Sequence, residues 1–168
     1  MRLFILTMAF VFGGLIVGCT SSIEPETYSV NNQSVTRVRT DTDWSENLHG
    51  EATHIDSLST LTNYIEENEE LFDFTQGNPS FETIVDNYDE TFFEHNTLLL
   101  IAYEENSGSI THEIDNIQID NGELIVNVER TKPQAGTTDM AAWHLIVELD
   151  RDEYDFESYD VLTQTTEE

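Results

Sequence analysis

The sequence has few basic residues and almost no cysteine. Only 6 of its 168 residues are Lys or Arg, against 34 Asp or Glu, so the formal charge is −28. Proteins that read nucleic acids need clustered Lys and Arg to bind phosphates, and this charge excludes that class of partner. The single cysteine, Cys19, excludes an internal disulfide framework and a cysteine-rich zinc site. Hydrophobic residues make up 38% of the chain, which is enough for the core of one small domain.

Long apolar runs are also lacking, except at the N-terminus. Residues 3–17 are apolar or glycine apart from Thr7, and they follow the basic residue Arg2. This stretch is shorter than the about 20 residues of a membrane-spanning helix. A charged start followed by a short apolar run is typical of a secretory signal peptide. Its end, Ile16-Val17-Gly18-Cys19, resembles the lipobox of prokaryotic lipoproteins.

The lipobox resemblance implies a covalent lipid on Cys19. In that family the cysteine sulfur is alkylated, since a thiolate is a good nucleophile, and cleavage after the residue that corresponds to Gly18 leaves the cysteine first in the mature chain. We therefore expect a lipoprotein held in the cell membrane by acyl chains such as palmitate, facing the extracytoplasmic side, with no cofactor besides the lipid. The alternative is an uncleaved anchor with an inert cysteine.

The acidic residues are spread along the whole chain. Removal of residues 1–18 would leave 150 residues and take away Arg2, so the charge would change from −28 to −29. One interpretation is a cation-binding surface. The favoured interpretation is a solvated surface adapted to high salt, as in halophilic proteins, because lysine is nearly absent. Salt at 1 M screens such charges within about 3 Å. Such a surface is repelled by anionic lipid, so the lipid on Cys19 must hold the protein at the membrane.

Composition and periodicity divide the chain into four parts. These are a signal peptide at 1–18, a lipidated tether at 19–40, an α+β domain at 41–150 and an acidic segment at 151–168. The tether is rich in Ser, Thr and Asn and includes one short edge strand at 35–39. The first half of the acidic segment contains aromatic residues that can pack, whereas its last residues are expected to fray.

Two helices and about four strands are expected within the domain. Caps at Ser57 and Ser80 and apolar residues at helical spacing predict helices at 57–68 and 80–93. One continuous apolar run predicts a strand buried on both faces, and three stretches in which apolar and polar residues alternate predict three more strands. A change of phase predicts a bulge near Asp115-Asn116, and Asn121-Gly122 predicts a hairpin turn. The strands are at 97–103, 110–119, 124–128 and 143–149. Short links predict antiparallel pairing, with both helices covering one face of the sheet.

Three segments between residues 92 and 150 carry a family resemblance. They are Phe92-Phe93, Ser107–His112 and Asp139–His144. Together with the two helices, they resemble small uncharacterised lipoproteins and secreted proteins of bacteria over residues 55–150. Their order is also similar to the C-terminal domain family of protease-stability-complex (PrcB-like) proteins. That resemblance implies a non-catalytic subunit that helps a partner protease to assemble or persist. The chain departs from the family at Trp143-His144, where a proline-aromatic pair is usual.

Two of the five histidines lie in predicted strands. His112 and His144 can approach each other there, and with Asp139 or Glu113 they would form a metal site. The favoured alternative is that each is an ordinary hydrogen-bonded strand residue, so no metal ligand is assigned. Neither histidine is accompanied by the glycine-flanked serine of a nucleophile elbow, and no catalytic residue is assigned.

Trp143 alternates with the apolar residues of the last predicted strand, which favours a place in the core. An exposed Trp143 would instead indicate a protein-contact site. A surface or ligand site, if formed here, would comprise His112, Trp143 and His144. The close basic pair Arg130 and Lys132 is expected to form ion pairs.

The expected function is that of a non-enzymatic accessory or protein-interaction module with an envelope protein as partner. One alternative is a lipoprotein that binds a divalent cation or small solute, which would stabilise the fold by mass action. The second alternative is an envelope hydrolase. It would require a pocket that combines a histidine with a perturbed carboxylate.

Overall fold

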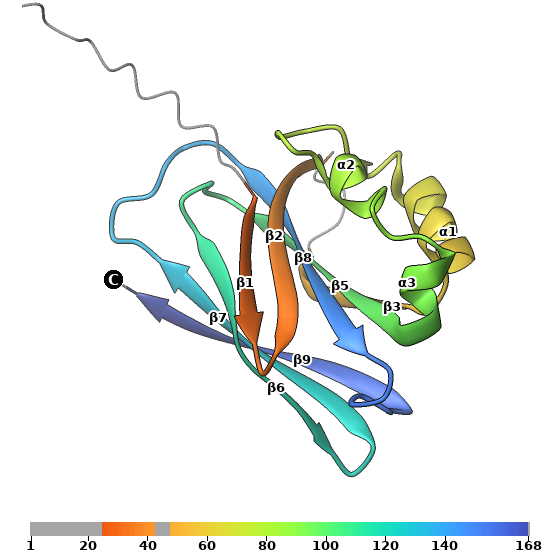
Figure 1. Cartoon of the computed structure of the whole chain (residues 1–168). Helices are drawn as coiled ribbons and strands as arrows, with labels where there is room; N and C mark the ends of the chain where they lie inside the picture. Colours follow the sequence, from red (N-terminus) through yellow and green to blue (C-terminus); the bar gives the residue numbers. More distant parts are fainter. Residues whose placement is uncertain (1–24, 43–47, 168) are drawn as a thin grey trace, which may run out of the picture.

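Two long strands, β5 (Asn96–Glu105) and β8 (Ala141–Asp150), pair at the centre of the molecule (Figure 1). The structure is a computed structural model that describes residues 25–42 and 48–167. The predicted signal peptide and Cys19 lie outside the described residues. The other elements are β1 (Glu26–Val30), β2 (Gln33–Thr42), β3 (His49–Ile55), α1 (Leu58–Asn68), β4 (Phe72–Asp73), α2 (Phe81–Val85), α3 (Glu90–His95), β6 (Thr111–Asp120), β7 (Glu123–Lys132) and β9 (Ser158–Glu167).

The strands form two sheets. The larger has six strands in the order β1-β2-β8-β5-β3, with β4 added beside β2, and the smaller has the order β6-β7-β9. A fold that mixes helices and strands is therefore confirmed, whereas the prediction of one sheet of about four strands is wrong. Pairing is antiparallel except between β7 and β9, which are parallel.

Alternate residues of β5 belong to two different apolar clusters. Leu98 and Leu100 pack with helix residues such as Phe81, and we call this group the helix-side cluster. Leu99 and Ile101 pack with residues of the small sheet, in the cluster between the sheets. Successive side chains of a strand point to opposite faces, so a strand between two clusters must be apolar at every position. This explains the uninterrupted apolar run that predicted a strand buried on both faces.

The three described helices begin at polar capping residues, and the sequence predicts two of these three caps. The Ser57 side chain accepts a hydrogen bond from the Thr60 amide at the start of α1, as predicted. The second predicted helix is instead two short helices, α2 and α3. Asp89 caps a new helix by accepting from the Phe92 amide at 2.9 Å, which separates α3 from α2.

Both ends of the described chain are more ordered than predicted. Residues 26–30 and 33–42, assigned largely to a tether, form β1 and β2, and β2 lies inside the sheet between β1 and β8. The expected fraying at the C-terminus is also wrong for residues 158–167, which form β9 along β7. β1 and β9 are mostly polar, because they lie at sheet edges and bury few side chains. β2 is also rich in polar residues, but most of its side chains are buried.

The β6–β7 hairpin has both predicted irregularities. The register shifts between Ile114 and Asn116, and the turn residues Asn121 and Gly122 have φ values of 53° and 84°. Positive φ at both central turn residues is the reason why Asn-Gly is favoured there. Within 25–42 and 48–167, no helix is long and apolar enough to cross a membrane.

Candidate functional site

His144 lies in the middle of β8 and is completely buried. Its Nδ1 is 3.0 Å from the hydroxyl of Thr40, and its Nε2 is 2.9 Å from the hydroxyl of Tyr64. The rings of Phe72 and Phe81 lie against the imidazole, at centroid distances of 4.6 and 4.9 Å. Burial lowers the pKa of His144 to about 3, so the ring is neutral at physiological pH. Both ring nitrogens thus have hydroxyl partners, Thr40 on β2 and Tyr64 on α1.

His112, on β6, lies on the other side of the large sheet. Its ring stacks on Tyr103 at 4.1 Å, and Tyr103 belongs to the cluster between the sheets. Its Nε2 is 2.8 Å from Oε1 of Glu105, which requires the neutral ring to carry its proton on Nε2. His112 and His144 thus face opposite sides of the large sheet and do not form a common site.

Trp143 is a core residue, as the favoured interpretation predicts. Only 2% of its surface is exposed, and it packs in the cluster between the sheets. The guanidinium carbon of Arg37 lies 4.6 Å from the centroid of the tryptophan ring. This contact is a cation–π interaction within the chain. Because the Trp143 side chain is buried, it is not available to contact another protein.

The strongest electrostatic cluster surrounds Glu105, at the end of β5. Its carboxylate accepts two hydrogen bonds from Arg130, from Nε to Oε1 and from Nη2 to Oε2, both at 2.6 Å. Burial of Glu105 opposes its ionisation, but the hydrogen bonds from Arg130 and His112 outweigh that effect and lower its pKa to about 2. Burial also lowers the pKa of His112, against the pull of Glu105. At neutral pH the cluster is a charged Glu–Arg pair beside a neutral histidine.

A small cavity of about 280 Å³ opens beside this cluster. Its lining combines the Glu105–Arg130 pair with Tyr103, Thr163, Thr165 and His49. The Tyr103 and Thr163 hydroxyls hydrogen-bond each other at 2.9 Å, and burial raises the pKa of Tyr103 to about 12. The cavity can accept water or a small polar molecule. Because Glu105 and Tyr103 keep one protonation state near pH 7, they are poorly suited to exchange protons with a ligand.

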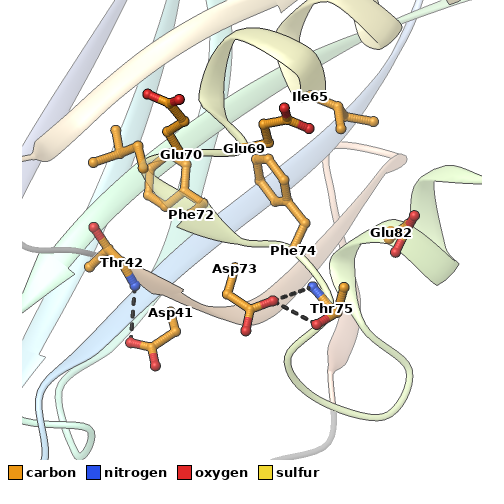
Figure 2. A pocket seen from close by; sticks show the side chains of 11 residues that line it. Asp41, Thr42, Ile65, Glu69, Glu70, Phe72, Asp73, Phe74, Thr75 and Glu82 are labelled. Atoms are coloured by element: carbon orange, nitrogen blue, oxygen red, sulfur yellow. Dashed lines mark hydrogen bonds between the residues drawn. The ribbon is translucent and has the colours of Figure 1, made fainter.

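A second hollow, of about 490 Å³, lies where α1, β2 and β4 meet (Figure 2). Phe72 and Phe74 form part of its wall. The carboxylates that line it come from Asp41, Glu69, Glu70, Asp73 and Glu82. Asp73 is already engaged, since it accepts hydrogen bonds from the amide and hydroxyl of Thr75, as the dashed lines in Figure 2 show. In the described part of the chain, no group of three or more His, Cys, Asp or Glu side chains is arranged to hold a metal ion.

The sequence pointed to only part of the Glu105 cluster. The ion-pair interpretation of Arg130 and Lys132 is confirmed, because Arg130 contacts Glu105 and Lys132 lies 4.0 Å from Glu167. Glu105 itself was missed, since one acid among 34 is not conspicuous. The available signal was its place at the end of the buried run 97–103, where a carboxylate needs a cation.

Comparisons with protein-family models, with curated proteins and with solved structures found no match to this chain.

Proposed function

We propose that the protein is a membrane-anchored extracytoplasmic lipoprotein whose domain acts as a non-catalytic module that binds another envelope protein. The observation that carries the non-catalytic part is the state of its acid–base groups. Both ring nitrogens of His144 bond hydroxyls inside the core, and the carboxylate of Glu105 is held by Arg130 and His112. Groups fixed in this way stabilise the fold and are poorly placed to transfer protons to a substrate.

The anchoring part of the proposal is supported by the sequence alone. Arg2, the apolar residues 3–17 and the single cysteine follow one another in the order of a lipoprotein signal. Each buried lipid methylene contributes about 0.8 kcal/mol, so two acyl chains hold a protein stably in a bilayer.

Cell fractionation with two variants tests the anchor. Cys19→Ser removes the thiol that would be alkylated, and we expect the protein to move from the membrane fraction to the soluble fraction. Gly18→Ala keeps a small residue before the cysteine and should leave the protein in the membrane. Equal membrane binding of the wild type and of Cys19→Ser would overturn the lipid anchor.

Crosslinking in native membranes tests the partner. Lys132 is the only lysine, so amine-reactive reagents are unsuitable, and a carboxyl-reactive crosslinker suits a chain with 34 acids. We expect one additional protein in a fixed ratio to this chain. Products that contain only this chain at every crosslinker concentration would contradict the accessory function.

Cation binding is a second candidate, and the carboxylate-lined hollow of Figure 2 is the observation that favours it. Thermal unfolding with 5 mM CaCl₂ or MgCl₂, compared with NaCl of equal ionic strength, separates binding from screening. A rise in Tm with the divalent salt that is lost in Asp41→Asn would favour this candidate over the accessory function. Equal Tm values in both salts would reject it.

A further inference from the structure

Three of the four outer strands that are longer than two residues have features that limit pairing with another chain. β1 is only five residues long. The edge of β6 is capped by side chains of β1 and of the β1–β2 turn, because the Tyr28 hydroxyl accepts from the Ile114 amide and Asn31 Nδ2 donates to the Ile117 carbonyl. On β3, the Ala52 carbonyl accepts a hydrogen bond from the Tyr159 hydroxyl. Proteins commonly shorten or cap edge strands in this way, since unpaired backbone groups attract other strands.

The fourth outer strand, β9, has none of these features. It is ten residues long, and its register with β7 runs without a break from Ser158 to Glu167. Across the described residues, no strand other than β7 and no side chain forms a hydrogen bond with the β9 backbone. In an edge strand, every second residue points its N–H and C=O away from the strand it pairs with and toward the open edge. The outer edge of β9 is therefore a row of unpaired donors and acceptors.

The middle of β9 carries no charged side chain. Residues 161–166 carry no charge, although 34 of the 168 residues are acidic. Leu162 has the largest exposed fraction, 48%, of the large hydrophobic side chains that the structure describes. Val161 packs toward the cluster between the sheets and Thr163 bonds Tyr103, so Leu162 points to the outer face of the small sheet. An uncharged edge thus coincides with an exposed apolar side chain.

We propose that a second copy of this chain pairs antiparallel with β9, with Leu162 opposite its own copy on a twofold axis. The two small sheets would then form one continuous sheet across the dimer. In this register Asp160 faces Gln164 of the other copy, and Ser158 faces Thr166. Like charges face each other only at the ends of the pairing, where Glu157 meets Glu167.

The pattern of β9 is compatible with pairing to its own copy. A strand that pairs about a twofold axis must be compatible with its own reversed sequence. Under that reversal Asp160 meets the neutral Gln164 and Leu162 meets its own copy, while Glu167 meets Glu157 at the ends of the pairing. The charge of −28 on each chain opposes association, so the dimer should be stable in molar salt and weak in dilute buffer. This self-association goes beyond the proposed lipid anchor and envelope partner, and it can be tested in purified protein.

Disulfide trapping tests the register. In the full chain carrying Cys19→Ser, Leu162→Cys places two thiols opposite each other, at a Cα separation of about 4.5 to 5.5 Å that a disulfide can bridge. Asp160→Cys is the matched control on the same strand and face. In the proposed register its two copies are offset by four residues, or about 13 Å, too far for a disulfide. We expect a covalent dimer from Leu162→Cys alone, and equal or stronger crosslinking of Asp160→Cys would overturn the register.

Sedimentation equilibrium of the full chain tests the association itself. In 2 M KCl we expect a dimer, and in 0.05 M KCl a shift toward monomer. Leu162→Asp places two carboxylates opposite each other and should weaken the dimer at least 10-fold. Met140→Asp, at a residue with a similar exposed fraction of 47%, should leave the affinity unchanged. A wild-type monomer in molar salt, oligomers larger than a dimer, or equal effects of both substitutions would reject the proposal.

Discussion

Two buried residues, His144 and Glu105, are stabilised by specific polar partners. His144 is completely buried, yet each ring nitrogen meets a hydroxyl group, from Thr40 and from Tyr64. Glu105 retains its charge because Arg130 supplies two hydrogen bonds to the carboxylate. Removal of one partner leaves the other buried without compensation, which costs more than the intact interaction contributes. Stability should therefore respond strongly to single substitutions at these positions.

The first prediction concerns pH and His144. The pKa of this histidine is about 3 in the folded protein and near 6.5 in an unfolded chain, so its contribution to stability is complete above pH 6.5 and is lost as the pH falls toward 3. The slope for one such group is about 1.4 kcal/mol per pH unit. His144→Gln keeps a donor and an acceptor but does not titrate. Urea unfolding at pH 7, 6 and 5 should show a shallower loss of stability in this variant than in wild type.

His95→Ala is the control for that measurement. His95 is exposed at the end of α3, so this variant should keep the wild-type slope. Parallel pH profiles of wild type and His144→Gln would show that His144 does not remain neutral in the folded protein.

The second prediction compares two cations on β7. Arg130→Ala leaves the buried Glu105 carboxylate without its partner, and we expect a loss of about 3 kcal/mol in the free energy of unfolding at pH 7. Lys132→Ala removes a contact of 4.0 Å between exposed side chains and should cost less than about 1 kcal/mol. Denaturant titration of both variants measures the difference. Similar losses would mean that Glu105 does not depend on Arg130.

At the scale of elements, the sequence predicts those strands and helices whose side chains are buried. β5 and β8 are apolar at most positions, and the Asn121-Gly122 turn is a specific hairpin signal, so these features could be recognised. β9 was not recognised, because one side of an edge strand meets solvent and its burial pattern is mostly exposed. The division between α2 and α3 was missed for another reason. An Asp at position 89 is one acid among many, and its capping role shows only in the bond to the Phe92 amide.

The candidate site shows the same limit. Each member of the Glu105 cluster could be named in the sequence, but the contact depends on three strands. Glu105 lies on β5, His112 on β6 and Arg130 on β7. The bulge between Ile114 and Asn116 could be recognised in the sequence, and it sets the pairing of His112 with Arg130. The packing of the small sheet against β5 brings Glu105 to both residues, and it cannot be derived from residue spacing along the chain.

The third prediction concerns β9. Ending the chain after Glu157 removes this strand and exposes the apolar residues of β7 that it adjoins, together with the site of Val161. We expect the free energy of unfolding to fall by about 3 kcal/mol or more, since burial of one such side chain contributes about 1.5 to 3 kcal/mol. Removal of residues 167–168 alone should change it by less than about 0.5 kcal/mol. Circular dichroism during thermal unfolding provides the measurement, and equal stability of both truncations would contradict a structural role for β9.

At the scale of the whole molecule, two apolar clusters are enclosed by a strongly charged surface. The large sheet contributes side chains to both clusters through β5 and β8, so the packing on its two faces is linked by two strands. The surface carries most of the 34 acids, and their mutual repulsion favours expanded states of the chain. Net stability is therefore the difference between apolar burial and a repulsion that depends on salt.

The fourth prediction is that salt raises the melting temperature. Between 0.05 and 2 M KCl, screening should reduce the repulsion, and we expect a gain of about 3 kcal/mol, which corresponds to about 10 °C in Tm for a chain of this size. KCl is preferable to sulfate salts, because sulfate also strengthens the burial of apolar groups. Differential scanning calorimetry measures the change. A Tm that does not vary with KCl would contradict adaptation of this surface to high salt.

The position of β2 within the large sheet has a consequence for biosynthesis. Thr40 and His144 are 104 residues apart, so β8 can pair with β2 only after about that many further residues have been synthesised. At a translation rate of about 5 to 20 residues per second, this interval lasts about 5 to 20 s. During that time the backbone of β2 lacks the hydrogen-bond partners that β8 supplies, and an unpaired strand of this kind can pair with other chains.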